Sequence, residues 1–156
     1  MANPDFAGRE YPATAPYSVG REKLREFASA VGALDPAHHD IVAARGLGYP
    51  DLVAPPTFAV VVAQRAESQY VQDPDADIDF SRVVHADEKF VHHRPIVAGD
   101  ELVTVLHVDS VTERAGIAMV TTRCEIFVVP GAGDDDAARE PVATVSSSLV
   151  IRGEDS

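Results

Sequence analysis

Two adjacent prolines followed by a helix without a polar face constrain the fold of this chain more than any other feature. Pro55 and Pro56 exclude a helix across that point, and Thr57 is of a residue type that caps helices. The stretch Phe58–Tyr70 is predicted to be helical, and the segment Phe58–Ala63 within it is entirely apolar. Because its valines are weak helix formers, we expect burial to hold this helix in place.

The second half of the chain is predicted to supply the sheet that buries this helix. Alternating and β-branched residues predict four long strands. They are Arg82–His92, Glu101–Arg114, Gly116–Val128 and Pro141–Arg152, with a brief extended piece at Tyr17–Val19. An antiparallel sheet wrapped around one apolar helix buries both elements. The predicted class is therefore α+β, with a single hot-dog fold.

The first half is predicted to contain two further helices. Arg21–Val31 has apolar residues at helical spacing, Gly32 follows it in the position of a left-handed helix terminus, and Asp40 can cap a short second helix. A length of 156 residues predicts one domain, residues 1–156. Within it we expect a loosely ordered lead-in (1–13), an acidic loop (131–138) and a frayed tail (153–156).

The charge balance excludes nucleic acid as a partner. Thirteen basic residues stand against 25 acidic ones, a net charge of −12, and no basic stripe is present. No stretch is long enough for a membrane span, and the N-terminus lacks the layout of a secretory signal, so we expect a cytoplasmic protein. The single cysteine, Cys124, lies in a predicted strand and is expected to be a buried apolar residue.

Five stretches of the chain, taken in order, carry a family resemblance. They begin at Tyr17, Leu47, Ala54, Arg82 and Arg94, and read YSVGREKLREFA, LGY, APPTF, RVVHADEKF and RPIVAGDEL. Together they resemble the actinobacterial MaoC-like dehydratase N-terminal-domain family, which includes the non-catalytic small subunits of (3R)-hydroxyacyl-ACP dehydratases. The resemblance extends over about residues 8–151.

The resemblance implies an acyl-thioester site between two hot-dog protomers and no cofactor. Catalytically complete relatives carry the motif Gly-Asp-x-Asn-Pro-x-His. The histidine serves as the acid or base next to the thioester carbonyl, and the aspartate activates water. A backbone N–H at the start of the buried helix holds the carbonyl oxygen. By this resemblance Pro55, Pro56, Thr57, Phe58 and Val61 are expected to bind substrate.

This chain departs from that motif at its acidic position. The motif aligns with Gly32–His38, which matches at Gly32, Pro36 and His38 but has Ala33 in place of the aspartate. His38 and His39 are the catalytic candidates. Because Ala33 cannot activate water, we favour the interpretation that they are solvent-facing or helix-capping histidines.

Three functions remain open from the sequence. The favoured one is a subunit that shapes the acyl channel of a dehydratase and pairs with a catalytic MaoC-like subunit. The second is a homodimeric enoyl thioester hydratase that uses His38 or His39 with Asp35 or Asp40. The third is a module that binds acyl thioesters without chemistry. The expected ligand is acyl-ACP or acyl-CoA. A thioesterase ranks lower, because no carboxylate precedes Glu67 on the central helix.

Other polar residues are given structural roles. His92 and His93 are adjacent in a predicted strand, so they should point to opposite faces, and no metal site is expected there. Asp87 and Glu88 are expected to form surface salt links, and Asp100 to cap a turn.

Overall fold

The computed structural model describes residues 2–130 and 139–153. The predicted acidic loop (131–138) and most of the predicted tail (154–156) lie outside the described residues. The helices are α1 (Arg21–Ala30), α2 (Ile41–Gly46) and α3 (Ala59–Val71), and the strands are β1 (Tyr17–Ser18), β2 (Val83–His92), β3 (Glu101–Arg114), β4 (Ile117–Val128) and β5 (Glu140–Arg152). Short 3-10 turns occur at Pro4–Phe6, Pro36–His38, Pro56–Phe58, Pro74–Ala76 and Phe80–Arg82.

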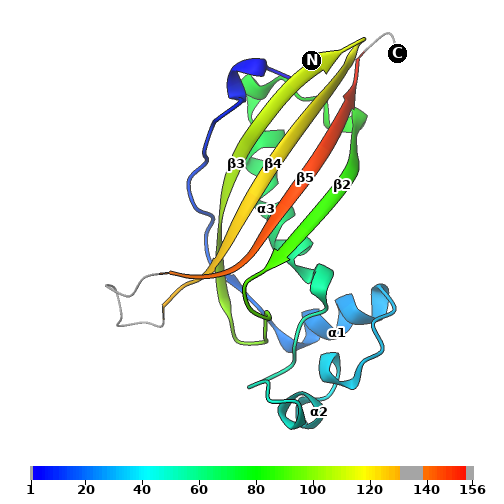
Figure 1. Ribbon diagram of the computed structural model, residues 1–156, viewed down its shortest axis with the longest axis vertical. Coiled ribbons are helices and arrows are strands. Elements are labelled where there is room, and N and C mark those ends of the chain that lie inside the picture. The colour runs from blue at the N-terminus through cyan, green and yellow to red at the C-terminus, as the bar shows by residue number, and fades with distance from the viewer. Residues whose placement is uncertain (1, 131–138, 154–156) are drawn as a thin grey trace.

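The strands form one antiparallel sheet in the order β1-β3-β4-β5-β2. The sheet curls around α3, while α1 and α2 lie together beyond one end of it (Figure 1). The predicted α+β class and the sheet wrapped around one helix are confirmed. The four long strands begin and end within one residue of their predicted bounds, because their alternating pattern matches one buried and one exposed face.

Small side chains on α3 let the sheet approach the helix closely. Ala59, Ala63 and Ala66 are all fully buried, and they recur at the spacing of one helix face. The Sγ of Cys124 on β4 lies 3.6 Å from the carbonyl oxygen of Ala63. Burial raises the pKa of the Cys124 thiol, so the cysteine is a packed core residue, as expected.

The start of α3 differs from the prediction in one respect. The helix begins at Ala59, preceded by a 3-10 turn, and no side chain caps it. Thr57 is exposed and was wrongly expected to be the cap. The reason is that the 3-10 turn after Pro55 already fixes the chain direction, since Phe58 N–H donates to the Pro55 carbonyl at 2.9 Å.

Glycines enable two of the sharpest changes of direction. Gly32, directly after the last turn of α1, has φ +70°, the left-handed conformation that was predicted for it. Ala115 and Gly116, with φ of 53° and 76°, form the two-residue turn between β3 and β4. The local sequence explains the conformation at both glycines, whereas Ala115 adopts a left-handed conformation that alanine disfavours.

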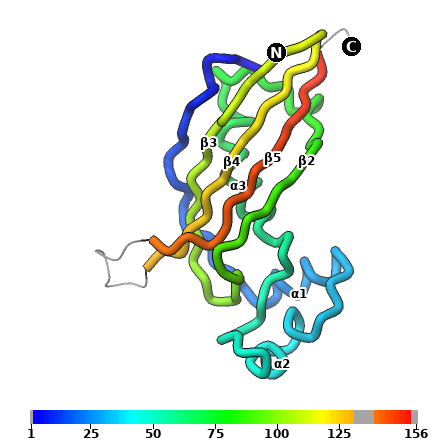
Figure 2. The backbone as a smooth tube through the Cα atoms, in the orientation of Figure 1, coloured from blue at the N-terminus to red at the C-terminus, as the bar shows by residue number. Residues whose placement is uncertain are grey.

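The N-terminal lead-in packs more firmly than expected. Its backbone runs alongside β3 (Figure 2), where Gly8 N–H donates to the Val108 carbonyl at 2.7 Å and Tyr11 N–H to that of Leu106 at 2.9 Å. Phe6 is buried against Tyr70 of α3, with ring centroids 5.9 Å apart. Backbone hydrogen bonds hold this segment to β3, and the buried ring of Phe6 anchors it to α3.

Among the described residues, no helix is long and apolar enough to cross a membrane.

We predict that Phe58→Ala lowers the free energy of unfolding by about 3–5 kcal/mol. Phe58 is fully buried between the rings of Phe27 and Tyr17, at centroid distances of 5.4 and 6.4 Å. The matched control is Phe80→Ala, because Phe80 is 72% exposed and its loss should change stability by less than about 0.5 kcal/mol. Urea denaturation followed by circular dichroism measures both. Equal losses in the two variants would contradict the packing described here.

Candidate functional site

A cavity of about 530 Å³ lies where the α1–α2 region meets the start of α3 and the end of β2. We call it the His38 cavity. Its wall is mostly apolar, with polar groups from the turn before α2 and from the end of β2. The lining residues are Asp35, Ala37, His38, Leu47, Tyr49, Val53, Ala54, Pro55, Pro56, His92, His93, Arg94, Pro95 and Ile96.

His38 is held in one orientation at this cavity. Its Nδ1 donates to the carbonyl oxygen of Val53 at 2.7 Å, and Val53 N–H in turn donates to the Ala37 carbonyl at 3.2 Å. A carbonyl can only accept, so the neutral ring carries its proton on Nδ1. Nε2 is then the nitrogen that can accept a proton, as a general base must.

His39 is placed differently from its neighbour. Its Nε2 donates to the Ala33 carbonyl at 2.9 Å, and its own carbonyl accepts from Arg25 Nε at 2.9 Å. It does not line the His38 cavity. The structure therefore brings only the first of the two candidate histidines to the cavity, and His39 ties the loop after α1 to the helix.

Neither Asp35 nor Asp40 takes the place of the aspartate that Ala33 replaces. The Oδ1 atom of Asp35 accepts from Ala37 N–H at 2.9 Å, and that of Asp40 accepts from Val42 N–H at 2.7 Å, so each caps a short helix. Asp35 lines the His38 cavity but Asp40 does not. Of these two aspartates, only Asp35 can therefore act together with His38. Its carboxylate already accepts a hydrogen bond from a backbone N–H.

The five residues expected to bind substrate divide into two groups. Pro55 and Pro56 line the His38 cavity. Thr57 is exposed, Phe58 is buried in the core and Val61 is half-buried, and none of the three lines the cavity. The prolines carry no N–H, so Thr57 offers the first backbone donor at this end of α3.

The end of β2 contributes polar residues that the sequence analysis did not assign to the cavity. His92 closes the strand, and His93 lies just beyond it, with its N–H donating to the Val142 carbonyl at 2.8 Å. Both therefore reach the cavity wall, because strict alternation of faces stops where the strand ends. Arg94 follows, paired with Asp100 through Nη2 and Oδ1 at 2.9 Å. Asp100 also accepts from Val97 N–H, as predicted for a turn-capping residue.

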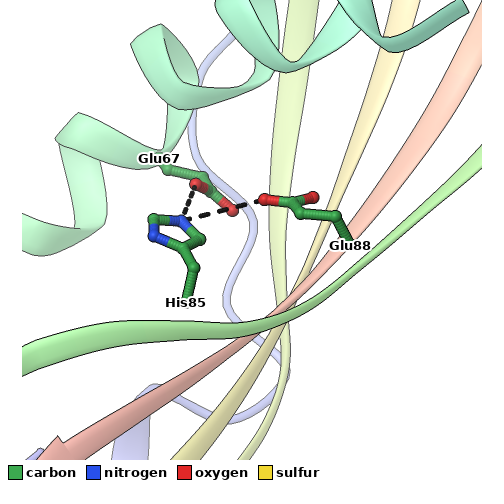
Figure 3. Close-up of side chains that lie close together, drawn as sticks. All are labelled: Glu67, His85 and Glu88. Atoms are coloured by element: carbon green, nitrogen blue, oxygen red, sulfur yellow. Dashed lines mark hydrogen bonds and ion pairs between the residues drawn. The ribbon is translucent and has the colours of Figure 1, made fainter.

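A second polar cluster lies between α3 and the sheet, away from this cavity. It consists of Glu67 on α3 and of His85 and Glu88 on β2, whose side chains point toward one another (Figure 3). Glu67 is only 4% exposed. We call these three residues the Glu67 cluster. In the sequence, the feature that could have indicated this cluster is Glu67 itself, a carboxylate one helical turn after Ala63 on the buried face of α3.

The expectation of a surface role for Glu88 is wrong. A β-bulge between His85 and Asp87 adds one residue to β2, so that Glu88 faces inward. Its carboxylate accepts from Ser147 Oγ at 2.9 and 3.0 Å. Burial is the main cause that raises the pKa of Glu88, the Ser147 hydrogen bond lowers it, and the negative charge of Glu67 raises it further.

Comparison with known proteins decides the family. A model of the FAS1-like dehydratase domain region matches residues 5–132, most of the chain. The chain belongs to this dehydratase family. A UPF0336 protein of Saccharopolyspora erythraea is 52% identical to the chain over 148 residues, which are 95% of this chain and 90% of that protein. The predicted resemblance is confirmed.

Solved structures place this dehydratase-family chain among hot-dog proteins. A chain of the HadBC (3R-hydroxyacyl-ACP dehydratase) complex of Mycobacterium tuberculosis matches with a TM-score of 0.77 and 35% identity, over 94% of this chain and 97% of that one. A MaoC-like dehydratase matches with a TM-score of 0.80 and 33% identity, over 96% of this chain and 43% of that one. The Mycobacterium tuberculosis protein RV0216, which has a double hot-dog fold, shares the fold at 16% identity and a TM-score of 0.70.

We predict that Glu88→Gln stabilises the protein at pH 7 when the buffer contains a chelator and no added metal ion. Because the pKa of Glu88 is raised above its ordinary value of 4.5, the native carboxyl binds its proton more tightly than the unfolded one. The free energy of unfolding therefore falls as pH rises from 4.5 through the raised native pKa. Urea titrations at pH 4 and pH 7 should show the variant gaining over wild type only at the higher pH. A variant that is less stable than wild type at pH 7 would contradict this assignment.

Proposed function

We propose that this chain is the channel-forming subunit of a cytoplasmic (3R)-hydroxyacyl thioester dehydratase, and that it pairs with a second, catalytic MaoC-like hot-dog subunit. Its substrate is an acyl thioester of ACP or CoA. The acyl group occupies the His38 cavity, whose wall includes Pro55 and Pro56. The chemistry takes place mainly on the partner's acid and base.

The observation that carries the proposal is a cavity with a base but without an activated acid. His38 is oriented by Val53 so that Nε2 can accept a proton. Hydration also needs a group that orients water. In catalytically complete relatives the motif's aspartate is that group, and this chain has Ala33 at the same position. A hydrophobic methyl group forms no hydrogen bond to water. The cavity thus offers a mostly apolar wall and one member of the catalytic pair, His38.

An apolar lip beside the cavity supports the pairing with a second subunit. Val31, Leu34, Val42 and Leu47 are 51%, 83%, 79% and 66% exposed, and Leu47 also lines the His38 cavity. Large exposed apolar side chains within one segment of the chain, residues 31–47, indicate an interaction surface. A partner subunit that covers this lip would also close the cavity from solvent.

The edge of the sheet gives a second reason to expect a partner. β2 is an edge strand that pairs with β5 on one side, and its Val84 and Val91 are 53% and 43% exposed. A long edge strand leaves one row of backbone N–H and C=O groups unpaired, and such edges are often covered by a partner. The chain to which this protein is 35% identical was solved as part of the HadBC complex.

Charge does not favour direct docking of an acidic carrier protein on this chain. Of its basic residues near the cavity, Arg94 is already paired with Asp100, and Arg45 donates from Nε to the Pro50 carbonyl at 3.2 Å. With a net charge of −12, the chain offers little attraction to an anionic carrier. On this proposal the catalytic subunit provides the basic docking surface.

A self-sufficient hydratase is the alternative that one observation favours. His38 and Asp35 line the same cavity, so an acid and a base of this chain face a common space. For this alternative, the Asp35 carboxylate would have to give up its bond to Ala37 N–H or use its second oxygen toward water.

The deciding experiment measures hydration of a trans-2-enoyl-CoA thioester. The chain is assayed alone and after co-expression with a MaoC-like subunit that carries the Asp-His pair. Variants in this chain are the pair His38→Ala with His39→Ala, and the control His107→Ala, which alters a histidine of β3 bonded to Glu125. Loss of enoyl absorbance gives the rate, and size-exclusion chromatography gives the assembly state.

The proposal predicts turnover only in the co-expressed complex, changed less than about threefold by the double variant. Removing a general base typically lowers the rate by about 10²–10⁴-fold. A loss of that size in the isolated chain, with His107→Ala unaffected, would establish the hydratase instead. Saturable thioester binding without turnover in either arm would leave the chain as a binding module.

A further inference from the structure

The Glu67 cluster brings three metal-ligating side chains to one point. Nε2 of His85 lies 3.5 Å from Oε2 of Glu67 and 3.8 Å from Oε1 of Glu88. One ligand atom from each of the three residues falls within 4.8 Å of both others. These atoms come from α3 and β2, two elements separated in sequence, and meet between the helix and the sheet (Figure 3).

These distances are close to those between ligands of a bound zinc ion. Bonds of about 2.0–2.2 Å from Zn²⁺ to nitrogen or oxygen place tetrahedral ligands about 3.3–3.6 Å apart. The separation between His85 and Glu67 already has this value, and that between His85 and Glu88 exceeds it by a few tenths of an ångström. The third separation, between the ligand oxygens of Glu67 and Glu88, is at most 4.8 Å.

The charge in the cluster is not balanced by the protein. Among the described residues, His85 is the only side chain within ion-pair distance of Glu67 or Glu88 that could carry a positive charge. Two carboxylates therefore share at most one positive charge, and Glu67 is almost fully buried. Burying a charge without compensation is costly. A divalent cation bound between the three side chains would remove this cost.

Hydroxyl groups fix the two carboxylates from behind. Thr122 Oγ1 donates to Oε1 of Glu67 at 2.6 Å, which leaves Oε2 directed to His85. Ser147 Oγ donates to the carboxylate of Glu88 at 2.9 and 3.0 Å. Both hydroxyls come from central strands of the sheet. Hydrogen bonds of this kind orient the ligands in protein metal sites.

A cavity gives access to the cluster and room for a further ligand. It has a volume of about 590 Å³ and is lined by Glu67 and His85, together with Gln64, Ser68, Val71, Gln72, Phe80 and Val83. It shares no lining residue with the His38 cavity. Three protein ligands with an open position facing a cavity are the arrangement of zinc sites that keep a water or a small ligand bound.

We propose that Glu67, His85 and Glu88 form a binding site for a divalent transition-metal ion of the Zn²⁺ class, with its open coordination position toward the 590 Å³ cavity. The ion links α3 to the edge strand β2 and stabilises the fold. This site is independent of the acyl cavity and of the proposed dehydratase role.

A second histidine with two carboxylate neighbours shows what the Glu67 cluster adds. On β3, His107 approaches Glu10 through Nδ1 at 3.5 Å and Glu125 through Nε2 at 3.1 Å. The two carboxylates meet opposite edges of the ring, so they cannot share an ion with it. Glu125 is also paired with Arg123 at 2.8 Å. His107 is therefore a matched control that has similar composition without convergence.

The test is metal binding by the purified full chain after treatment with a chelator. Zn²⁺ is added alone, and its stoichiometry and affinity are measured by isothermal titration calorimetry. Co²⁺ is used as a spectroscopic probe of coordination, and Tm is recorded with and without metal. The variants are Glu67→Gln, His85→Ala, Glu88→Gln and Thr122→Val, with His107→Ala as control. Circular dichroism checks that each variant folds.

The proposal predicts one tight Zn²⁺ equivalent per chain, with Tm rising by roughly 5–10 °C at about 100 times Kd. Each ligand variant should lose that equivalent and the Co²⁺ absorption bands. Thr122→Val should weaken binding by about 10–100-fold, and His107→Ala should bind as wild type does. The proposal is overturned by a wild-type chain whose Tm does not respond to Zn²⁺, or by binding that persists in folded Glu67→Gln and His85→Ala.

Discussion

The close packing of α3 against the inner face of the sheet is the interaction on which the rest of the molecule depends. Ala59, Ala63 and Ala66 keep this helix face flat, so that β3, β4 and β5 can curl around it. The burial of the helix overrides the low helix propensity of its valines. It also fixes where the prolines before the helix lie, and through them the wall of the His38 cavity.

Much of the fold could be predicted because single elements obey local rules. Alternation located the four long strands, and Gly32 and Asp40 marked a helix end and a helix start as expected. Thr57 misled because the 3-10 turn after Pro55 replaced side-chain capping. The packing of Phe6 against Tyr70 could not be predicted, since it depends on a contact across 64 positions of the sequence rather than on local pattern.

The candidate sites were harder to predict because each is assembled from several elements. The motif singled out His38, but its place at a cavity depends on the contact with Val53, and the contribution of His93 depends on where β2 ends. Glu88 was assigned to the surface, like its neighbour Asp87, because it is charged, and the bulge turns it inward. Sequence patterns give the face of a residue only while the register is regular.

That bulge also sets how the chain can tolerate insertions and deletions. Beyond Ala86, every residue of β2 has the face that the extra position gives it, from Asp87 to the end of the strand. Removal of Ala86 would leave Asp87 opposite Ser148 as it is now, so Glu88 and Phe90 would keep the inner face, whereas removal of Lys89 would turn Phe90 outward. Among descendants of this sequence, loss of one residue at the bulge should therefore be tolerated better than loss of one residue between Glu88 and His92.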